Sequence, residues 1–126
     1  HKLISNLKAT MLEYKSIGIA APQIGSFHRT FIAMDIVFVD PKITWRSDET
    51  SVYEESCLSF PQLSRLKIKI KRPSEVKFEY TQEKDDEAIK KFDGMMARVI
   101  LHEYDHLNGN LMIDYEEVRE EALIGE

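Results

Sequence analysis

The chain has 126 residues, a mass of 14.7 kDa and a formal net charge of −5 at pH 7. This length and a hydrophobic content of 43% predict a single domain over residues 1–126 with a sizeable core. The acidic balance, with lysines mixed among glutamates, argues against a surface that binds nucleic acid directly. No apolar run is long enough to span a membrane, so we expect no membrane partner.

The first predicted element is an amphipathic helix that ends near Tyr14. Apolar residues recur there at helical spacing and should face the core, namely Leu3, Ile4, Leu7, Met11 and Leu12. Residues 16–25 contain two glycines and a proline, and this composition predicts an irregular loop. Residues 30–39 are rich in Phe, Ile and Val, which predicts one buried strand bounded by Pro41.

The middle of the chain is predicted to be strand-rich. After a polar loop at 46–51, apolar and charged residues alternate over 66–70 and again over 75–80. A period of two indicates half-buried strands with one solvent-exposed face. A charged turn at 82–87 should lead into one more strand at 88–92.

The last predicted element is a helix that begins at the N-cap Asp93, continues to Leu107 and ends at Asn108 and Gly109. Strands followed by a helix predict an α+β fold. We expect antiparallel β-sheets packed around this central helix, with the N-terminal amphipathic helix beside them.

This last helix carries the most informative motif of the sequence, which is His102, Glu103 and His106. Side chains four residues apart lie on one helix face, so both imidazoles can bind one metal ion. A glutamate beside the metal can accept a proton from water, as metal-assisted hydrolysis requires. The alternative is a solvent-exposed helix with two surface histidines.

A catalytic metal usually has three protein ligands, and the histidines supply two. An extended zinc-protease motif would place a third histidine at position 112, which is Met112 here. Glutamates of the charged C-terminal tail are a second source, at Glu116, Glu117, Glu120 and Glu121. Cys57 is the third source, since a thiolate suits zinc or ferrous iron, although a lone cysteine is more often a small hydrophobic residue.

Three motifs together resemble the peptide deformylase family. They are Gly18-Ile19-Ala20-Ala21-Pro22-Gln23-Ile24-Gly25, Glu55-Ser56-Cys57-Leu58-Ser59 and His102-Glu103-Tyr104-Asp105-His106-Leu107. The resemblance covers most of the chain. It implies a metal-dependent enzyme that removes the formyl group from the N-terminal formyl-methionine of nascent polypeptides and releases formate.

The resemblance also implies a role for each matching residue. Cys57, His102 and His106 would bind the metal, and Glu103 would act as the general acid and base. Gln23 and the backbone N–H of Leu58 would donate hydrogen bonds to the carbonyl oxygen as it becomes negative.

The substrate-binding residues also follow from motif position. Ile17 and Val99 would line an apolar slot for the methionine side chain, and the main chains of Gly18 and Ser56 would pair with an extended peptide. Ile17 and Val99 are otherwise ordinary core residues. The family pattern commonly has glycine at positions 16 and 56 and a polar residue at 101, where this chain has Ser16, Ser56 and Leu101.

The resemblance favours Fe²⁺ as the single divalent cofactor, while a Cys-His-His set also suits Zn²⁺, Ni²⁺ or Co²⁺. The expected partners are N-formylmethionyl peptides emerging from the ribosome. The expected location is the cytoplasm of a bacterium, or of the host if a phage encodes the chain, with an organelle as the alternative. No secretory leader is recognised. The sequence begins at His1 without the strand that precedes the first helix in the family, which indicates trimming or disorder of that strand.

Two other functions remain open at this point. One is a homologue that binds metal and peptide N-termini but has lost catalysis, and the other is a zinc endopeptidase. Catalysis, unlike metal binding, requires Glu103 and Gln23, so their presence argues against the first. Met112 argues against the second.

Overall fold

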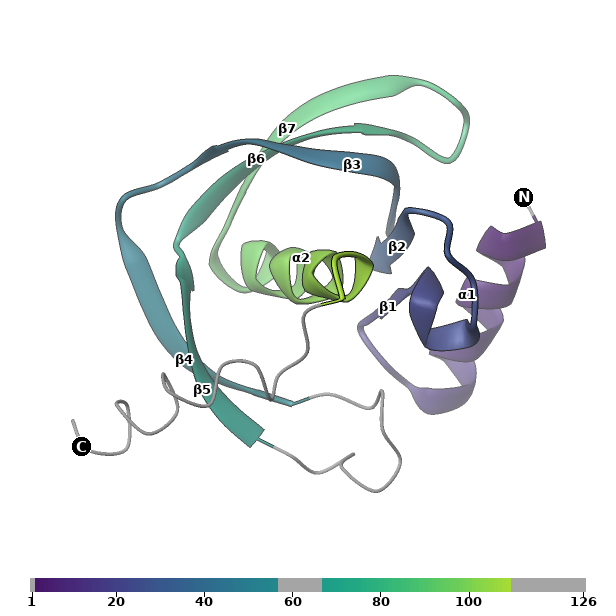
Figure 1. The fold of residues 1–126 in the computed structure, drawn as a ribbon, viewed down its shortest axis with the longest axis horizontal. Coiled ribbons are helices and arrows are strands. Elements are labelled where there is room, and N and C mark those ends of the chain that lie inside the picture. Colours follow the sequence, from purple (N-terminus) through teal and green to yellow (C-terminus); the bar gives the residue numbers. More distant parts are fainter. Residues whose placement is uncertain (1, 57–66, 110–126) are drawn as a thin grey trace.

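The computed structural model describes residues 2–56 and 67–109. The elements are α1 (Lys2–Tyr14), β1 (Gly18–Ala20), the 3₁₀ helix η1 (Ala21–Ile24), β2 (Thr30–Ala33), β3 (Ile36–Arg46), β4 (Thr50–Ser56), β5 (Lys67–Pro73), β6 (Glu75–Thr81), β7 (Glu87–Asp93) and α2 (Gly94–Leu107). Five strands form an antiparallel sheet in the order β1-β2-β3-β6-β7, and β4 pairs with β5 in a second sheet. The strands curve around α2 (Figure 1), which confirms the predicted α+β arrangement with a central helix.

Helix α1 confirms the predicted N-terminal helix and its end at Tyr14. Its inner face is narrower than expected. Ile4 and Leu7 are buried against Ile19 and Ile32, and Leu3 and Met11 are partly buried at the edge of this cluster. Leu12 is 82% exposed, so its assignment to the core stripe was wrong, because it lies just beyond the face that packs on the sheet.

Residues 16–25 contain more regular secondary structure than the predicted irregular loop. They contain the short strand β1 and the 3₁₀ helix η1. A strand of three residues has too few positions to show a period of two in the sequence. Its pairing partner, strand β2, lies 13 residues away, with Ile19 opposite Ile32, and such a partner leaves no local signal.

The single strand predicted over 30–39 is two strands. The chain turns between β2 and β3 at Met34, whose φ of 58° is left-handed. Strand β3 then continues past Pro41 to Arg46, so Pro41 does not bound it. The sheet register shifts between Val39 and Lys42, and this irregularity accommodates a proline that lacks a backbone donor.

The remaining predicted strands are confirmed. Strands β5 and β6 cover the two alternating segments from Lys67 on, and β7 covers the strand expected over 88–92. The loop expected over 46–51 shrinks to the residues between β3 and β4. Helix α2 follows Asp93, whose backbone is extended as an N-cap requires, and Asn108 caps its end. Asp93 makes no side-chain capping hydrogen bond, so only its position was predicted correctly.

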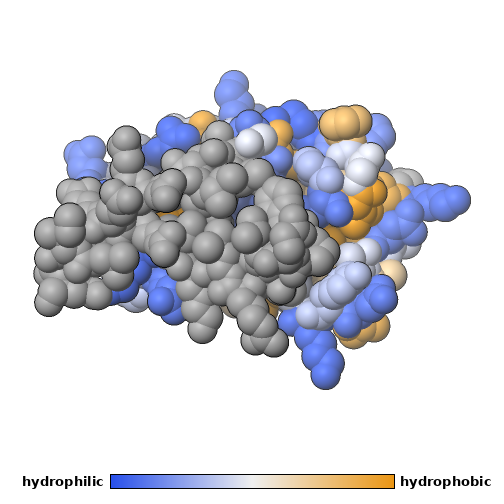
Figure 2. All heavy atoms as spheres, turned by 60° about the horizontal axis from the view of Figure 1, so that its bottom comes forward, coloured by the Kyte–Doolittle hydropathy of each residue, from blue (hydrophilic) through white to orange (hydrophobic). Residues whose placement is uncertain are grey.

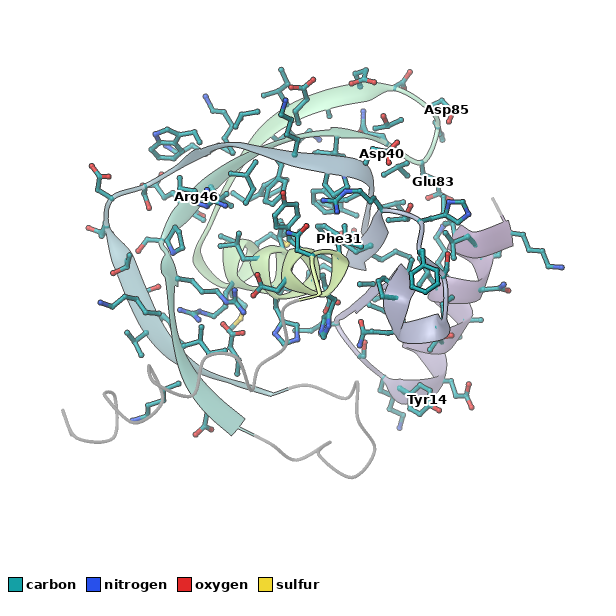
Figure 3. The ribbon with its side chains drawn as sticks, viewed as in Figure 1. Tyr14, Phe31, Asp40, Arg46, Glu83 and Asp85 are labelled. Carbon is teal, nitrogen blue, oxygen red and sulfur yellow. The ribbon has the colours of Figure 1, made fainter. Side chains whose placement is uncertain are left out.

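The core lies between the five-stranded sheet and α2. Phe31, labelled in Figure 3, points into this space and stacks on Phe38 with ring centroids 4.6 Å apart. The ring centroids of Phe38 and Tyr80 lie 4.3 Å apart. Helix α2 is buried over most of its circumference, including Ile100, which is fully buried. A helix held in this way fixes the directions of the polar side chains that it carries.

Charged side chains cover much of the outer surface. Glu83, labelled in Figure 3, comes from the turn between β6 and β7 and pairs with Lys8 of α1, with Nζ and Oε2 2.8 Å apart. On the face shown in Figure 2, hydrophilic residues project around small hydrophobic patches. Among the described residues, no helix has the length and apolar character that crossing a bilayer requires.

Candidate active site

The two histidines of the motif lie on one face of α2. The rings of His102 and His106 have centroids 5.1 Å apart and planes inclined by 73°. His106 is buried, and the side chain of His102 is 13% exposed. The alternative of two surface histidines is therefore wrong, because α2 is the central helix of the fold.

Glu103 is buried beside the histidines, with 5% exposure. It packs against Gly18 of β1 so closely that a Cβ at position 18 would lie 2.7 Å from Oε2 of Glu103. The same Cβ would lie 3.0 and 3.1 Å from Cγ and Cδ of that side chain. Glycine at position 18 therefore makes room for the carboxylate, and the first and third motifs meet at this contact.

Gln23 belongs to η1, directly after β1. Its Oε1 accepts a hydrogen bond of 2.7 Å from the backbone N–H of Ala20. Because a backbone N–H can only donate, this contact assigns the carbonyl and NH₂ ends of the amide. Pro22 precedes it in η1, where a fixed φ and a missing N–H suit the first turn of a helix. Gln23 is thus held with its carbonyl oxygen on Ala20 and its NH₂ group at the opposite end of the amide.

Glu55 of β4 connects the second motif to the histidines. Its Oε1 lies 3.0 Å from Nδ1 of His102. Arg72 of β5 donates to both carboxylate oxygens, from Nε at 2.6 Å and from Nη2 at 2.8 Å, and Arg98 of α2 donates to Oε2. This buried carboxylate therefore joins the two-stranded sheet to the central helix.

The electrostatics of this cluster favour an ionised Glu55. Burial alone would raise the pKa of its carboxyl group, but hydrogen bonds from Arg72 and His102, together with their charges, lower the pKa to about 2. Burial would also lower the pKa of Arg72, yet Glu55 and Asp105 raise it above its usual value. The group facing Nδ1 of His102 is consequently a carboxylate.

This contact bears on how His102 can act as a ligand. A carboxylate at Nδ1 fixes the tautomer with the proton on that nitrogen, so Nε2 is the atom that would bind a cation. Two imidazoles on one face and a carboxylate behind the first of them suit a divalent metal of the zinc or iron type. Within residues 2–56 and 67–109, no three His, Cys, Asp or Glu side chains are arranged so that they could hold one metal ion together. Cys57, the predicted third ligand, and Leu58 lie outside the described residues, as do Met112 and the tail glutamates.

The predicted substrate residues have different surroundings. Ile17 is 56% exposed, next to Gly18, whereas Val99 is 7% exposed and packs in the main core cluster. Ser56 is the last residue of β4, and its backbone pairs with Lys67. The roles proposed for these residues stay predictions.

The sequence interpretation gave no role to Glu55, Arg72, Arg98 or Asp105. Arg72 also contacts Asp105, with Nη1 and Oδ2 2.8 Å apart, and Arg98 donates to the backbone oxygens of Ile70 and Ser51. One signal in the sequence could have indicated this cluster. Arg98 lies between apolar residues of the central helix, and a buried arginine requires a partner.

The fold and the site define an α+β protein of the hydrolase class, with a His-Glu-x-x-His helix at its centre. The polypeptide deformylase family model matches residues 1–121. The peptide deformylase of Thermotoga maritima is 38% identical over 118 residues, which cover 90% of this chain and 70% of that protein. This chain therefore belongs to the polypeptide deformylase family.

Solved structures agree with this assignment. The crystal structure of the Thermotoga maritima enzyme matches with a TM-score of 0.83 over 90% of this chain and 78% of that chain. A Plasmodium falciparum peptide deformylase in complex with an inhibitor is 31% identical and matches 98% of this chain and 79% of that chain, with a TM-score of 0.86. A Met-Ala-Ser-bound class I type b peptide deformylase from Acinetobacter baumannii is 34% identical, with a TM-score of 0.81 over 90% of this chain and 79% of that chain.

Proposed function

We propose that this chain hydrolyses the formamide of N-terminal formyl-methionine on nascent polypeptides and releases formate, with one divalent metal ion as cofactor. The observation that carries the proposal is the meeting of the three motifs. Glu103 packs on Gly18, and His102 contacts Glu55, which precedes Cys57 by two residues. The proposal requires the Cys57 thiol to lie within reach of the histidines, and the two residues of chain after Glu55 span at most about 7 Å.

Cys57, His102 and His106 would hold the metal. When bound, the cation would lower the pKa of water to near neutrality and polarise the formyl carbonyl. The family favours Fe²⁺, and the same ligands suit Zn²⁺, Ni²⁺ or Co²⁺. The carboxylate of Glu55 would support the site from behind, because its contact with Nδ1 makes His102 a better ligand.

Glu103 would move the proton. Its carboxylate accepts a proton from the attacking water and then passes it to the amine nitrogen of the leaving methionine. Burial at 5% exposure and the contact with Gly18 restrict the positions open to this side chain. A restricted base needs little reorganisation before it reacts.

Gln23 and Leu58 would stabilise the developing negative charge. The NH₂ group of Gln23 donates to the formyl oxygen while its carbonyl end stays on Ala20. The backbone N–H of Leu58 supplies the second donor. Neither group can compete for the metal, since both are donors.

The peptide would bind along β1, which is a terminal strand of the described five-stranded sheet. An extended segment can add to such an edge through main-chain hydrogen bonds from Gly18 and from Ser56. Ile17 is exposed beside this edge and would contact the methionine side chain together with Val99. The peptide N-terminus would then lie near Glu103, which packs on Gly18.

The substrates proposed here are formyl-methionyl peptides as they leave the ribosome, which implies a cytoplasmic enzyme. Formate release from formyl-Met-Ala-Ser by anaerobically purified protein tests the proposal. We expect turnover in the wild type, and Glu103→Ala should keep its metal but release no formate. A metal-loaded wild type without turnover would instead support a binding homologue, and cleavage within Met-Ala-Ser would support an endopeptidase.

A further inference from the structure

The two edges of strand β1 have different hydrogen-bonding partners. The carbonyl of Ile17 accepts the N–H of Met34 at 2.6 Å, so this peptide group points toward β2. Neighbouring residues of a strand direct their backbone groups to opposite edges. The backbone N–H and C=O groups of Gly18 and Ala20 therefore point away from β2, toward the edge along which no described strand pairs.

A single side chain occupies both backbone groups of Gly18 on that edge. The hydroxyl of Ser16 donates to the carbonyl oxygen of Gly18 at 2.6 Å, and the Oγ atom accepts the N–H of Gly18 at 3.3 Å. Ser16 itself is fixed because its N–H donates to Met11 at the end of α1, at 3.0 Å. The hydroxyl thus satisfies the donor and the acceptor that a paired strand would otherwise use.

We propose that Ser16 is a displaceable cap on the peptide-binding edge, and that it sets the affinity for substrate without taking part in the chemistry. This inference rests on the proposed binding of peptide along β1. Gly18 is also the residue on which Glu103 packs, so the capped residue lies beside the carboxylate that would act as the base. An entering peptide must exchange the Ser16 hydrogen bonds for its own.

Removal of the Ser16 hydroxyl should strengthen peptide binding. When Ser16 is present, each new main-chain hydrogen bond replaces one that already exists, and the gain on binding is reduced. Without the hydroxyl, Gly18 exchanges only water for peptide. The cap would also keep the backbone groups of Gly18 from pairing with other chains, as polar side chains on edge strands commonly do.

The test is steady-state deformylation of formyl-Met-Ala-Ser by Ser16→Ala and Ser16→Gly, with Ser16→Thr as the variant that keeps the hydroxyl. Ser26→Ala is the matched control, because Oγ of Ser26 accepts a similar hydrogen bond from the N–H two residues ahead, that of His28, at 3.3 Å. We expect KM to fall about three- to tenfold in Ser16→Ala and Ser16→Gly, the effect of about one net hydrogen bond. The kcat should stay within about twofold, and Ser16→Thr and Ser26→Ala should keep the wild-type KM.

A KM that is unchanged or raised in both Ser16→Ala and Ser16→Gly would overturn the inference, as would Ser16→Thr behaving like Ser16→Ala. A purely structural role for Ser16 would weaken binding and could not tighten it. Calorimetric titration with Met-Ala-Ser separates this inference from the proposed function, because it needs no turnover. If the wild type releases no formate, tighter peptide binding by Ser16→Ala still supports the cap, and equal, weaker or undetectable binding contradicts it.

Discussion

Replacing Gly18 by alanine should impair catalysis through Glu103 without unfolding the protein. The added Cβ would lie 2.7 Å from Oε2 of Glu103, so the carboxylate must retreat by about 0.7 Å to reach an ordinary van der Waals distance. Position 18 is not among those with a left-handed φ, so the backbone tolerates alanine. A misplacement of about 1 Å at a reacting group can cost about 100-fold in rate, and we expect kcat to fall roughly 10- to 100-fold.

Formate release and thermal unfolding should be measured on the same Gly18→Ala preparation. Gly94→Ala is the matched control, because Gly94 has a left-handed φ of 57° and a Cβ there meets nothing within 4 Å among the described residues. The control should lose stability by about 1 kcal/mol and keep its kcat. Full activity in Gly18→Ala would refute the reasoning.

Three further substitutions test the neighbouring groups. Gln23→Ala should lower kcat about 100- to 1000-fold with the metal retained, since it removes one donor to the developing oxyanion. An unchanged rate constant in single-turnover kinetics would exclude that role. Glu55→Ala should reduce the free energy of unfolding by about 3–5 kcal/mol in urea titrations, because Arg72 loses its bidentate partner in the interior. It should also weaken metal binding about 10- to 100-fold, and an unaltered metal affinity would show that the contact with His102 does not support a ligand. Cys57→Ala should lower the metal content measured after anaerobic purification, and full occupancy would place the third ligand elsewhere.

The sequence predicted the fold class and the central helix because their signals are local. The helix period in residues 94–107 and its stop at Asn108 are set by neighbouring residues, and the structure confirms both. Strand β1 was missed since three residues show no period, and its position depends on pairing with β2. The turn at Met34 was missed because the apolar run continues through it.

The candidate site was predicted in part for a similar reason. The spacing of His102 and His106 is a property of one helix, so it could be read from the sequence. The cluster around Glu55 joins residues 17, 43 and 47 positions apart, namely Arg72, Arg98 and His102. Such contacts arise only when β4, β5 and α2 pack together. A buried arginine on the helix indicated that a carboxylate was needed but not which one.

The most direct test of the central claim is an anaerobic titration in which Fe²⁺ is returned to metal-stripped protein while formate release from formyl-Met-Ala-Ser is followed. The proposed mechanism requires the rate to rise in proportion to bound metal and to level off at one ion per chain. A rate that is independent of bound metal, or a fully loaded protein that releases no formate, would contradict it.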